Sequence, residues 1–230
     1  MIAESIEKIN GEIREICEKC GRSRDDVTLI AVSKTKPVSD IEEALKTGTL
    51  DFGENKVQEL CSKCEVLPEN IRWHLIGHLQ RNKVKYVTGK TALIHSVDSL
   101  RLAEKIEEES AKREITTDIL IEVNVSGEES KFGVSPDETE GLVRQIAKME
   151  HVRVRGLMTI APYTSDPESN REYFRALRQL SVDIKQKNID NVCMNELSMG
   201  MSGDYRVAIE EGATFVRVGT AIFGERNYTT

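Results

Sequence analysis

Residues 27–37 read VTLIAVSKTKP, an apolar, β-branched run that ends abruptly in polar residues. The stretch from Val27 to Val32 has the composition of a short buried strand, and Ser33 and Lys34 follow it directly. Similar short runs recur along the chain, and they alternate with longer stretches whose apolar residues recur every three or four positions. This alternation is typical of βα units around a parallel sheet.

The number of such runs favours a closed barrel, because an open doubly wound sheet usually has about five or six strands. The predicted strands are Val27 to Val32, Leu50 to Phe52, Trp73 to Ile76, Leu93 to His95, Asp118 to Asn124, Val152 to Met158, Glu196 to Ser198 and Phe215 to Val218. The predicted helices between them are Ser39 to Lys46, Glu54 to Glu65, Leu79 to Val87, Ser99 to Arg113, Pro136 to Met149, Glu168 to Lys187 and Asp204 to Glu211.

An additional helix is predicted before the first strand, where isoleucines recur at helical spacing from Ile2 to Ile16. No linker rich in Pro, Gly or Ser divides the chain. We therefore expect an α/β protein in which residues 1–230 form one domain, a single (β/α)8 TIM barrel with an extra N-terminal helix.

The charge balance indicates small-molecule partners. The 230 residues include 39 acidic and 32 basic ones, for a formal charge of -7, which disfavours nucleic acid or an anionic membrane as the main partner. The N-terminal residues include acids where a secretory signal needs basic and apolar ones, and no apolar run approaches the ~20 residues that span a bilayer. We expect a cytoplasmic protein, and a monomer, because no exposed apolar heptad demands a partner.

Two Cys-x-x-Cys pairs, Cys17 with Cys20 and Cys61 with Cys64, could formally supply four thiolates to a zinc ion. Both pairs lie in helical patterns, without the glycine-containing turn that usually presents such ligands. Structural thiols are therefore favoured, in the reduced state that is usual in the cytoplasm, and no metal site is predicted.

Lys34 is the first candidate functional residue, because the C-terminal ends of barrel strands are where active sites gather. A lysine in partly dry surroundings has a lowered pKa, and its neutral amine can attack an aldehyde to form an imine. A structural lysine that pairs with Glu54 or Glu122 explains the same position equally well. Lys36 is a second candidate nucleophile, but the proline after it indicates that it already belongs to the loop.

Two glycine-containing loops follow the seventh and eighth predicted strands, LSMGMSG at 197–203 and RVGTAIFG at 217–224. Barrels of this kind often bind phosphate at this place, through backbone amides exposed by glycine and through Ser or Thr hydroxyls. Ser198, Gly219 and Thr220 fit that role. One such loop is a weak signal, since glycine also serves tight turns, but two neighbouring loops favour a phosphate site.

Several further motifs occur in a fixed order over nearly the whole chain. They are CGRS at 20–23, AVSKTKP at 31–37, FGEN at 52–55, WHLIGHLQ at 73–80, SVD at 96–98, EVN at 122–124, KFG at 131–133, RGLM at 155–158, LSMGMS at 197–202 and RVGT at 217–220. With these motifs the sequence resembles the pyridoxal phosphate homeostasis protein family, whose fold is that of the barrel domain of bacterial alanine racemase.

The resemblance implies a fold like that of type III pyridoxal phosphate proteins, with pyridoxal 5'-phosphate as the cofactor. It implies that Lys34 holds the cofactor as a Schiff base and that Arg217 faces the pyridine nitrogen. The phosphate site implied by the resemblance consists of Ser198, Gly219 and Thr220. The residues implied to line the ring are Asn55, His78 and Met158.

Binding is favoured over turnover. Racemisation by two bases needs an acid/base on each face of the substrate carbanion, and in alanine racemase the second base comes from an additional domain across a dimer. After the last loop only 225–230 remain, where Tyr228 is the sole candidate. An arginine at the ring nitrogen also disfavours its protonation and weakens the cofactor as an electron sink.

We therefore predict a non-catalytic carrier that buffers intracellular pyridoxal phosphate, helps to balance amino-acid metabolism and passes the cofactor to apo-enzymes that depend on it. The alternative is a low-activity, pyridoxal-phosphate-dependent amino-acid racemase. A third interpretation is a barrel that binds a phosphate ligand without forming a Schiff base.

Overall fold

The computed structural model describes residues 1–225, in which eight parallel strands close into a barrel. The strands are β1 (Thr28–Val32), β2 (Asp51–Glu54), β3 (Arg72–Leu75), β4 (Leu93–Val97), β5 (Thr117–Glu122), β6 (Val152–Met158), β7 (Val192–Met201) and β8 (Phe215–Val218). Each strand pairs with the next one in sequence, and β8 closes the barrel onto β1, where Ile30 is opposite Arg217. The predicted (β/α)8 barrel is confirmed.

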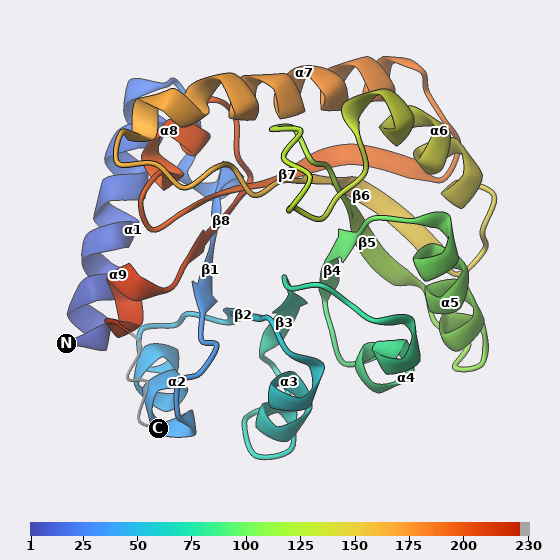
Figure 1. Ribbon diagram of the computed structural model, residues 1–230. Helices are drawn as coiled ribbons and strands as arrows, with labels where there is room; N and C mark the ends of the chain where they lie inside the picture. Colours follow the sequence, from blue (N-terminus) through green and yellow to red (C-terminus); the bar gives the residue numbers. More distant parts are fainter. Residues whose placement is uncertain (226–230) are drawn as a thin grey trace.

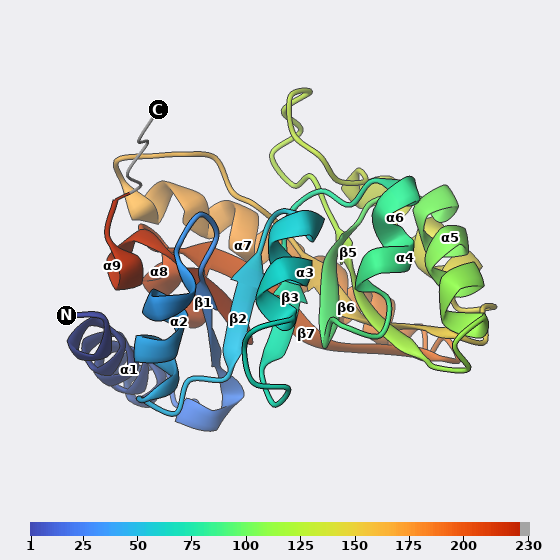
Figure 2. The ribbon, with the colours of Figure 1, turned by 90° about the horizontal axis from the view of Figure 1, so that it is seen from below.

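Helices surround the strands (Figure 1). They are α1 (Ile2–Lys19), α2 (Val38–Leu45), α3 (Val57–Cys64), α4 (Val84–Val87), α5 (Leu100–Ala111), α6 (Pro136–Ile146), α7 (Arg171–Gln186), α8 (Tyr205–Glu210) and α9 (Thr220–Phe223), with 3-10 turns at Arg24–Asp26, Arg81–Lys83 and Pro167–Asn170. The extra N-terminal helix is confirmed: α1 buries Ile6, Ile9, Ile13 and Ile16 and packs against α2, α8 and α9, as Figure 2 also shows.

The structure corrects several predicted boundaries. Strand β2 continues to Glu54, whose side chain is buried, so the helix predicted from Glu54 begins only at Val57. The helix predicted over 79–87 is a 3-10 turn followed by the single turn α4, and α9 was not predicted. Strand β7 is much longer than the predicted Glu196 to Ser198, because it pairs with β6 both before and after an irregularity in register.

Alternate residues of each strand face the helices or the barrel interior. Those that face the helices form one large apolar core, to which Leu29, Ala31 and Phe52 belong. The interior contains a much smaller apolar cluster of Leu93, Leu120 and Met158, with Phe215 packed against it. The remaining interior positions include buried polar side chains, namely His74, His95, Ser198 and Arg217.

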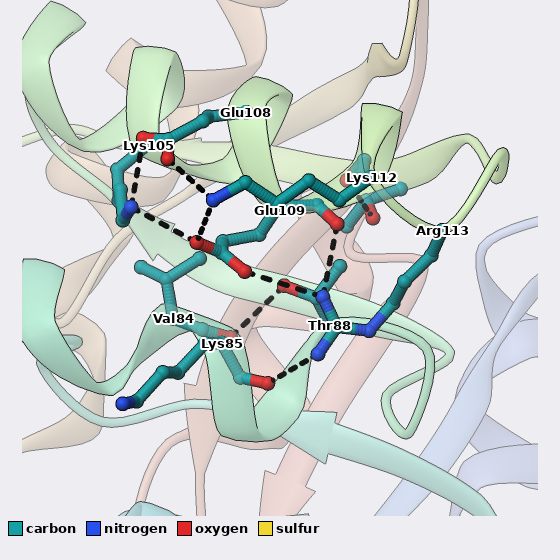
Figure 3. Close-up of polar contacts among 10 residues, drawn as sticks. Val84, Lys85, Thr88, Lys105, Glu108, Glu109, Lys112 and Arg113 are labelled. Atoms are coloured by element: carbon teal, nitrogen blue, oxygen red, sulfur yellow. Dashed lines mark hydrogen bonds and ion pairs between the residues drawn. The ribbon is translucent and has the colours of Figure 1, made fainter.

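The short helix α4 is fastened to its neighbour α5 by polar contacts (Figure 3). Arg113, just after α5, donates a hydrogen bond of 2.7 Å to the carbonyl oxygen of Lys85 in α4. The buried Glu109 of α5 pairs with Lys105 at 2.9 Å and with Lys112, just after the helix, at 3.0 Å. The hydrogen bond from Arg113 reaches α4, a single helical turn that would not be stable alone.

Within residues 1–225, none of the helices combines the length and apolar character needed to cross a membrane. The five cysteines are free thiols, and the two Cys-x-x-Cys pairs lie at the C-terminal end of α1 and in α3. In this described part of the chain, no group of three or more His, Cys, Asp or Glu side chains is placed to hold a metal ion. Tyr228, considered as a second base, lies outside the described residues.

Candidate functional site

Most of the polar residues predicted after the strands lie at the C-terminal end of the barrel, but Ser198 lies inside β7, three residues before its end. Lys34 follows the end of β1, and Arg217 and Gly219 belong to the end of the adjacent strand β8. A Cβ atom on Gly219 would lie 3.3 Å from the carbonyl oxygen of Val32, so the two strand ends are in close contact. Ser202 accepts a hydrogen bond of 3.2 Å from the Gly219 amide, which joins the loops after β7 and β8.

The backbone on both sides of Lys34 is held by side chains of α3. Lys63 Nζ donates a hydrogen bond of 2.8 Å to the carbonyl oxygen of Ser33, and Glu59 Oε1 accepts one of 2.6 Å from the Thr35 amide. Thr35 has a φ of 64°, a left-handed conformation that is uncommon for residues other than glycine. The position of Lys34 is therefore imposed by tertiary contacts.

A buried carboxylate lies beneath this segment. Glu54 Oε1 accepts hydrogen bonds from Ser33 Oγ at 2.6 Å and Lys63 Nζ at 2.7 Å, whereas its Oε2 atom is buried without a hydrogen-bond partner. Burial raises the pKa of Glu54, although the contacts with Lys63 and Ser33 act in the opposite direction. Lys63 was not predicted as a site residue, because its signal in the sequence was limited to a spacing of four residues from Glu59 on one helix.

Arg217 is buried inside the barrel. Its Nη1 atom donates a hydrogen bond of 2.6 Å to Ser198 Oγ, and its Nη2 atom donates one of 2.8 Å to the carbonyl oxygen of Thr159. Burial lowers the pKa of Arg217 to about 10, although Glu122 and Asp204 oppose the effect. The guanidinium is therefore still a cation at neutral pH, and the hydrogen bonds of its two terminal nitrogen atoms fix its orientation.

Ser198 belongs to a polar network that the sequence analysis did not predict. Its hydroxyl lies 2.8 Å from His95 Nδ1, and His95 Nε2 lies 2.9 Å from His74 Nδ1. His74 Nε2 is in turn 3.0 Å from Asp51 Oδ1, which Arg72 also contacts. A signal existed, because His74 and His95 each interrupt an apolar predicted strand, but a single strand does not reveal which residues its side chains meet.

The residues predicted to line the ring occupy the ends of three other strands. Asn55 follows β2, and Gly77 packs so closely on it that a Cβ on Gly77 would lie 2.5 Å from the Asn55 carbonyl oxygen. His78 is exposed and stacks on Phe132 with the ring centroids 4.2 Å apart. Phe132 belongs to the segment that projects beyond the barrel between β5 and α6 (Figure 2). Met158 is fully buried at the end of β6. Their contacts with a cofactor stay predictions.

Glu122 adds a titratable group at the end of β5. It is 5% exposed, and burial together with the nearby Asp98 raises its pKa to about 7, while Arg217 lowers it. The carboxyl group therefore changes its charge near neutral pH, beside the buried guanidinium. Thr220, the last predicted site residue, is exposed at the first turn of α9.

Two cavities lie at the opposite end of the barrel. One of about 310 Å³ is lined by residues that include Leu29 and Leu50, and one of about 290 Å³ by residues that include His74 and Phe215; both are bordered by Asp51. Leu29, Asp51 and Phe215 lie at or next to the N-terminal ends of their strands, Leu50 precedes β2, and His74 lies deeper, as the third residue of β3. The cavities are thus separated from Lys34 by the length of the barrel.

Residues 5–227 match the family of the alanine racemase N-terminal domain. The chain is 46% identical over 226 residues to the pyridoxal phosphate homeostasis protein of Aquifex aeolicus, with 98% of each chain covered. It is 40% identical over 228 residues to the protein of the same name from Pseudomonas aeruginosa, with 99% of this chain and 96% of the relative covered.

Solved structures show the same fold. The structure of PipY from Synechococcus elongatus PCC7942 with pyridoxal phosphate bound has a TM-score of 0.84 at 33% identity and covers 97% of this chain and 100% of PipY. An alanine racemase of Clostridium difficile 630 has a TM-score of 0.77 at 14% identity, and the match covers 97% of this chain and 57% of the racemase. The latter is a likeness of fold alone.

Proposed function

Because the chain belongs to the pyridoxal phosphate homeostasis protein family, within the family of the alanine racemase N-terminal domain, we propose that residues 1–230 act as one domain that binds pyridoxal 5'-phosphate and buffers it. One observation carries the proposal: the adjacent strands β1 and β8 bring Lys34, Arg217 and Gly219 to one end of the barrel. That arrangement supplies the amine of Lys34, the buried cation of Arg217 and a stretch of backbone that no side chain covers at Gly219.

These groups fit the chemistry of the cofactor. Lys34 would hold the cofactor through its Nζ amine, and the aldehyde of the bound cofactor would supply the chemistry for a reversible imine bond. The amide and hydroxyl of Thr220 suit the phosphate, and Arg217 suits the pyridine nitrogen as a hydrogen-bond donor. The Gly219 amide donates to Ser202 Oγ in this structure, and its contact with phosphate stays a prediction. Ser198 was predicted at the phosphate; its hydroxyl contacts Arg217 and His95 in this structure, and its contact with phosphate stays a prediction.

A carrier function is supported by the character of Arg217. A guanidinium that stays charged does not give its proton to the ring nitrogen, so the ring is a poor electron sink and carbanion chemistry is slow. Reversible attachment to Lys34 then serves to store the cofactor and to pass it to apo-enzymes. We expect this carrier to act as a monomer in the cytoplasm.

A low-activity amino-acid racemase is the second candidate, and Glu122 is the observation that favours it. Its pKa of about 7 suits a group that exchanges protons at neutral pH. Turnover of a panel of L-amino acids at rates usual for enzymes, abolished by Lys34→Ala and reduced by Glu122→Gln, would establish the racemase and refute the carrier.

The cofactor and its attachment are tested together by adding pyridoxal phosphate to the purified protein, recording the visible spectrum, reducing with borohydride and locating the modified peptide by mass analysis. We expect a yellow protein that is labelled at Lys34. Lys36→Ala is the matched control, because Lys36 Nζ instead binds the carbonyl oxygens of Phe223 at 2.7 Å and Glu225 at 3.0 Å.

Lys34→Ala should abolish the colour and the label, while Lys36→Ala should retain both. A label on another lysine would refute the assignment of Lys34. Tight binding without a visible band would instead support a phosphate-ligand barrel that forms no Schiff base.

A further inference from the structure

Five polar side chains form a continuous path through the barrel interior. Their order is Arg217 (β8), Ser198 (β7), His95 (β4), His74 (β3) and Asp51 (β2), with successive polar atoms 2.6, 2.8, 2.9 and 3.0 Å apart. None of the five residues is more than 7% exposed. The interior of such a barrel is usually filled by branched apolar side chains, so this polar path is unusual and its groups need partners.

When His74 Nδ1 carries no proton, the two ends of the path define the direction of every hydrogen bond. A guanidinium can only donate, so Ser198 Oγ accepts from Arg217. At the other end Asp51 is a carboxylate: burial favours its protonation, but hydrogen bonds from Arg72 and His74 outweigh burial and lower its pKa. His74 therefore donates through Nε2 and, when neutral, accepts through Nδ1.

The two middle groups follow from these ends. His95 donates through Nε2 to His74, which leaves His95 Nδ1 as the acceptor for the Ser198 hydroxyl proton. Burial, with His74 and Arg217 nearby, holds the pKa of His95 well below its usual range, which is consistent with a neutral ring. Each hydrogen bond of the path is then donated in the direction from Arg217 toward Asp51. Arg217 only donates, Asp51 only accepts, and the three residues between them do both.

Resting on the proposed function, we propose that Ser198, His95, His74 and Asp51 are positioning residues that aim the Arg217 guanidinium at the cofactor ring. The Ser198 hydroxyl proton is committed to His95, so an oxygen lone pair is presented to Arg217. The Thr159 carbonyl oxygen holds the second guanidinium nitrogen. Without the path, Ser198 can rotate its proton toward Arg217 and repel it.

The path also connects the two ends of the barrel. Asp51 borders both cavities at the N-terminal end, and its partner Arg72 has a side chain that is 55% exposed there. The orientation of Arg217 is thereby anchored at the rim opposite Lys34. This explains why two histidines and a carboxylate occupy an interior that could have been apolar.

The direction of the path is tested by nitrogen NMR of the histidine rings in the whole chain, without added cofactor. We expect His95 to be neutral at pH 7.5 with its proton on Nε2, and His74 to carry a proton on Nε2. A proton on Nδ1 of His95, or a doubly protonated His95 ring, would overturn the proposed direction. This readout does not depend on cofactor binding.

The effect on the cofactor is tested with Ser198→Ala and His95→Leu, in the spectrum and dissociation constant of added pyridoxal phosphate. We expect a shifted visible band and binding weakened by about tenfold or more, the effect of losing a charged hydrogen bond. His95→Gln keeps a donor and an acceptor and should restore part of the loss, and it also serves if His95→Leu fails to fold.

Ser110→Ala is the matched control, because Ser110 Oγ is equally buried and lies 2.7 Å from Thr117 Oγ1, outside the path. Ser110→Ala should lower the melting temperature, as Ser198→Ala should, but it should leave the visible spectrum of added pyridoxal phosphate unchanged. If Ser198→Ala and Ser110→Ala give the same spectrum and affinity while the wild-type protein binds the cofactor, the positioning role is refuted. If the wild-type protein forms no visible complex, the proposed function fails instead, and the NMR result decides whether the path exists.

Discussion

Replacing Glu122 with Gln should stabilise the protein above neutral pH by up to about 3 kcal/mol. Burial and Asp98 raise the pKa of Glu122 from 4.5 to about 7, and each pKa unit corresponds to about 1.4 kcal/mol. Since the folded-state pKa is the higher one, the folded protein holds this proton more tightly than the unfolded chain. The contribution to stability is full below pH 4.5 and is lost as the pH rises through 7.

The assay is chemical denaturation of the wild-type and Glu122→Gln proteins between pH 4.5 and 8.5, without cofactor. Gln is neutral throughout, so the variant should gain relative stability with increasing pH and level off above pH 7 to 8. Glu211→Gln is a control of opposite sign: hydrogen bonds from Arg175 and Arg171 outweigh burial and lower the pKa of Glu211, so this variant should lose stability at neutral pH. A Glu122→Gln protein no more stable than wild type at pH 8.5 would refute the reasoning.

Two further substitutions test the architecture of the site. Lys63→Met should lower the free energy of unfolding in denaturant by about 3 to 5 kcal/mol, because it leaves the buried Glu54 carboxylate without its cation. It should also weaken cofactor binding by releasing the backbone beside Lys34. Unchanged stability would show that Glu54 is protonated and the pair unimportant. Gly77→Ala should lower the melting temperature markedly, since its Cβ would lie 2.5 Å from the Asn55 carbonyl oxygen. The control is Gly141→Ala in α6, where the Cβ meets open space, and it should raise the free energy of unfolding by about 0.5 to 1 kcal/mol. Equal effects of the two glycine substitutions would contradict the close approach at Gly77.

Much of the barrel could be predicted from the sequence alone, because its signals are local. Short stretches rich in valine predicted β6 and β8 with their observed bounds, and the isoleucine spacing of α1 matches the face that it buries. The position of Lys34 just beyond the end of β1 could be predicted for the same reason, whereas its role stays a prediction. Where the local signal was interrupted, as at Glu54 or within β7, the predicted bounds were wrong.

Only the tertiary structure decided which polar residues meet. Ser198 and His95 are 103 positions apart in the chain, yet closure of the barrel places their polar atoms 2.8 Å apart. Lys63 became part of the site in the same way, because α3 folds back onto the segment around Lys34. The spacing of residues along one strand or helix carries no information about the register between distant strands. That register is set by closing eight strands into one barrel around a common core.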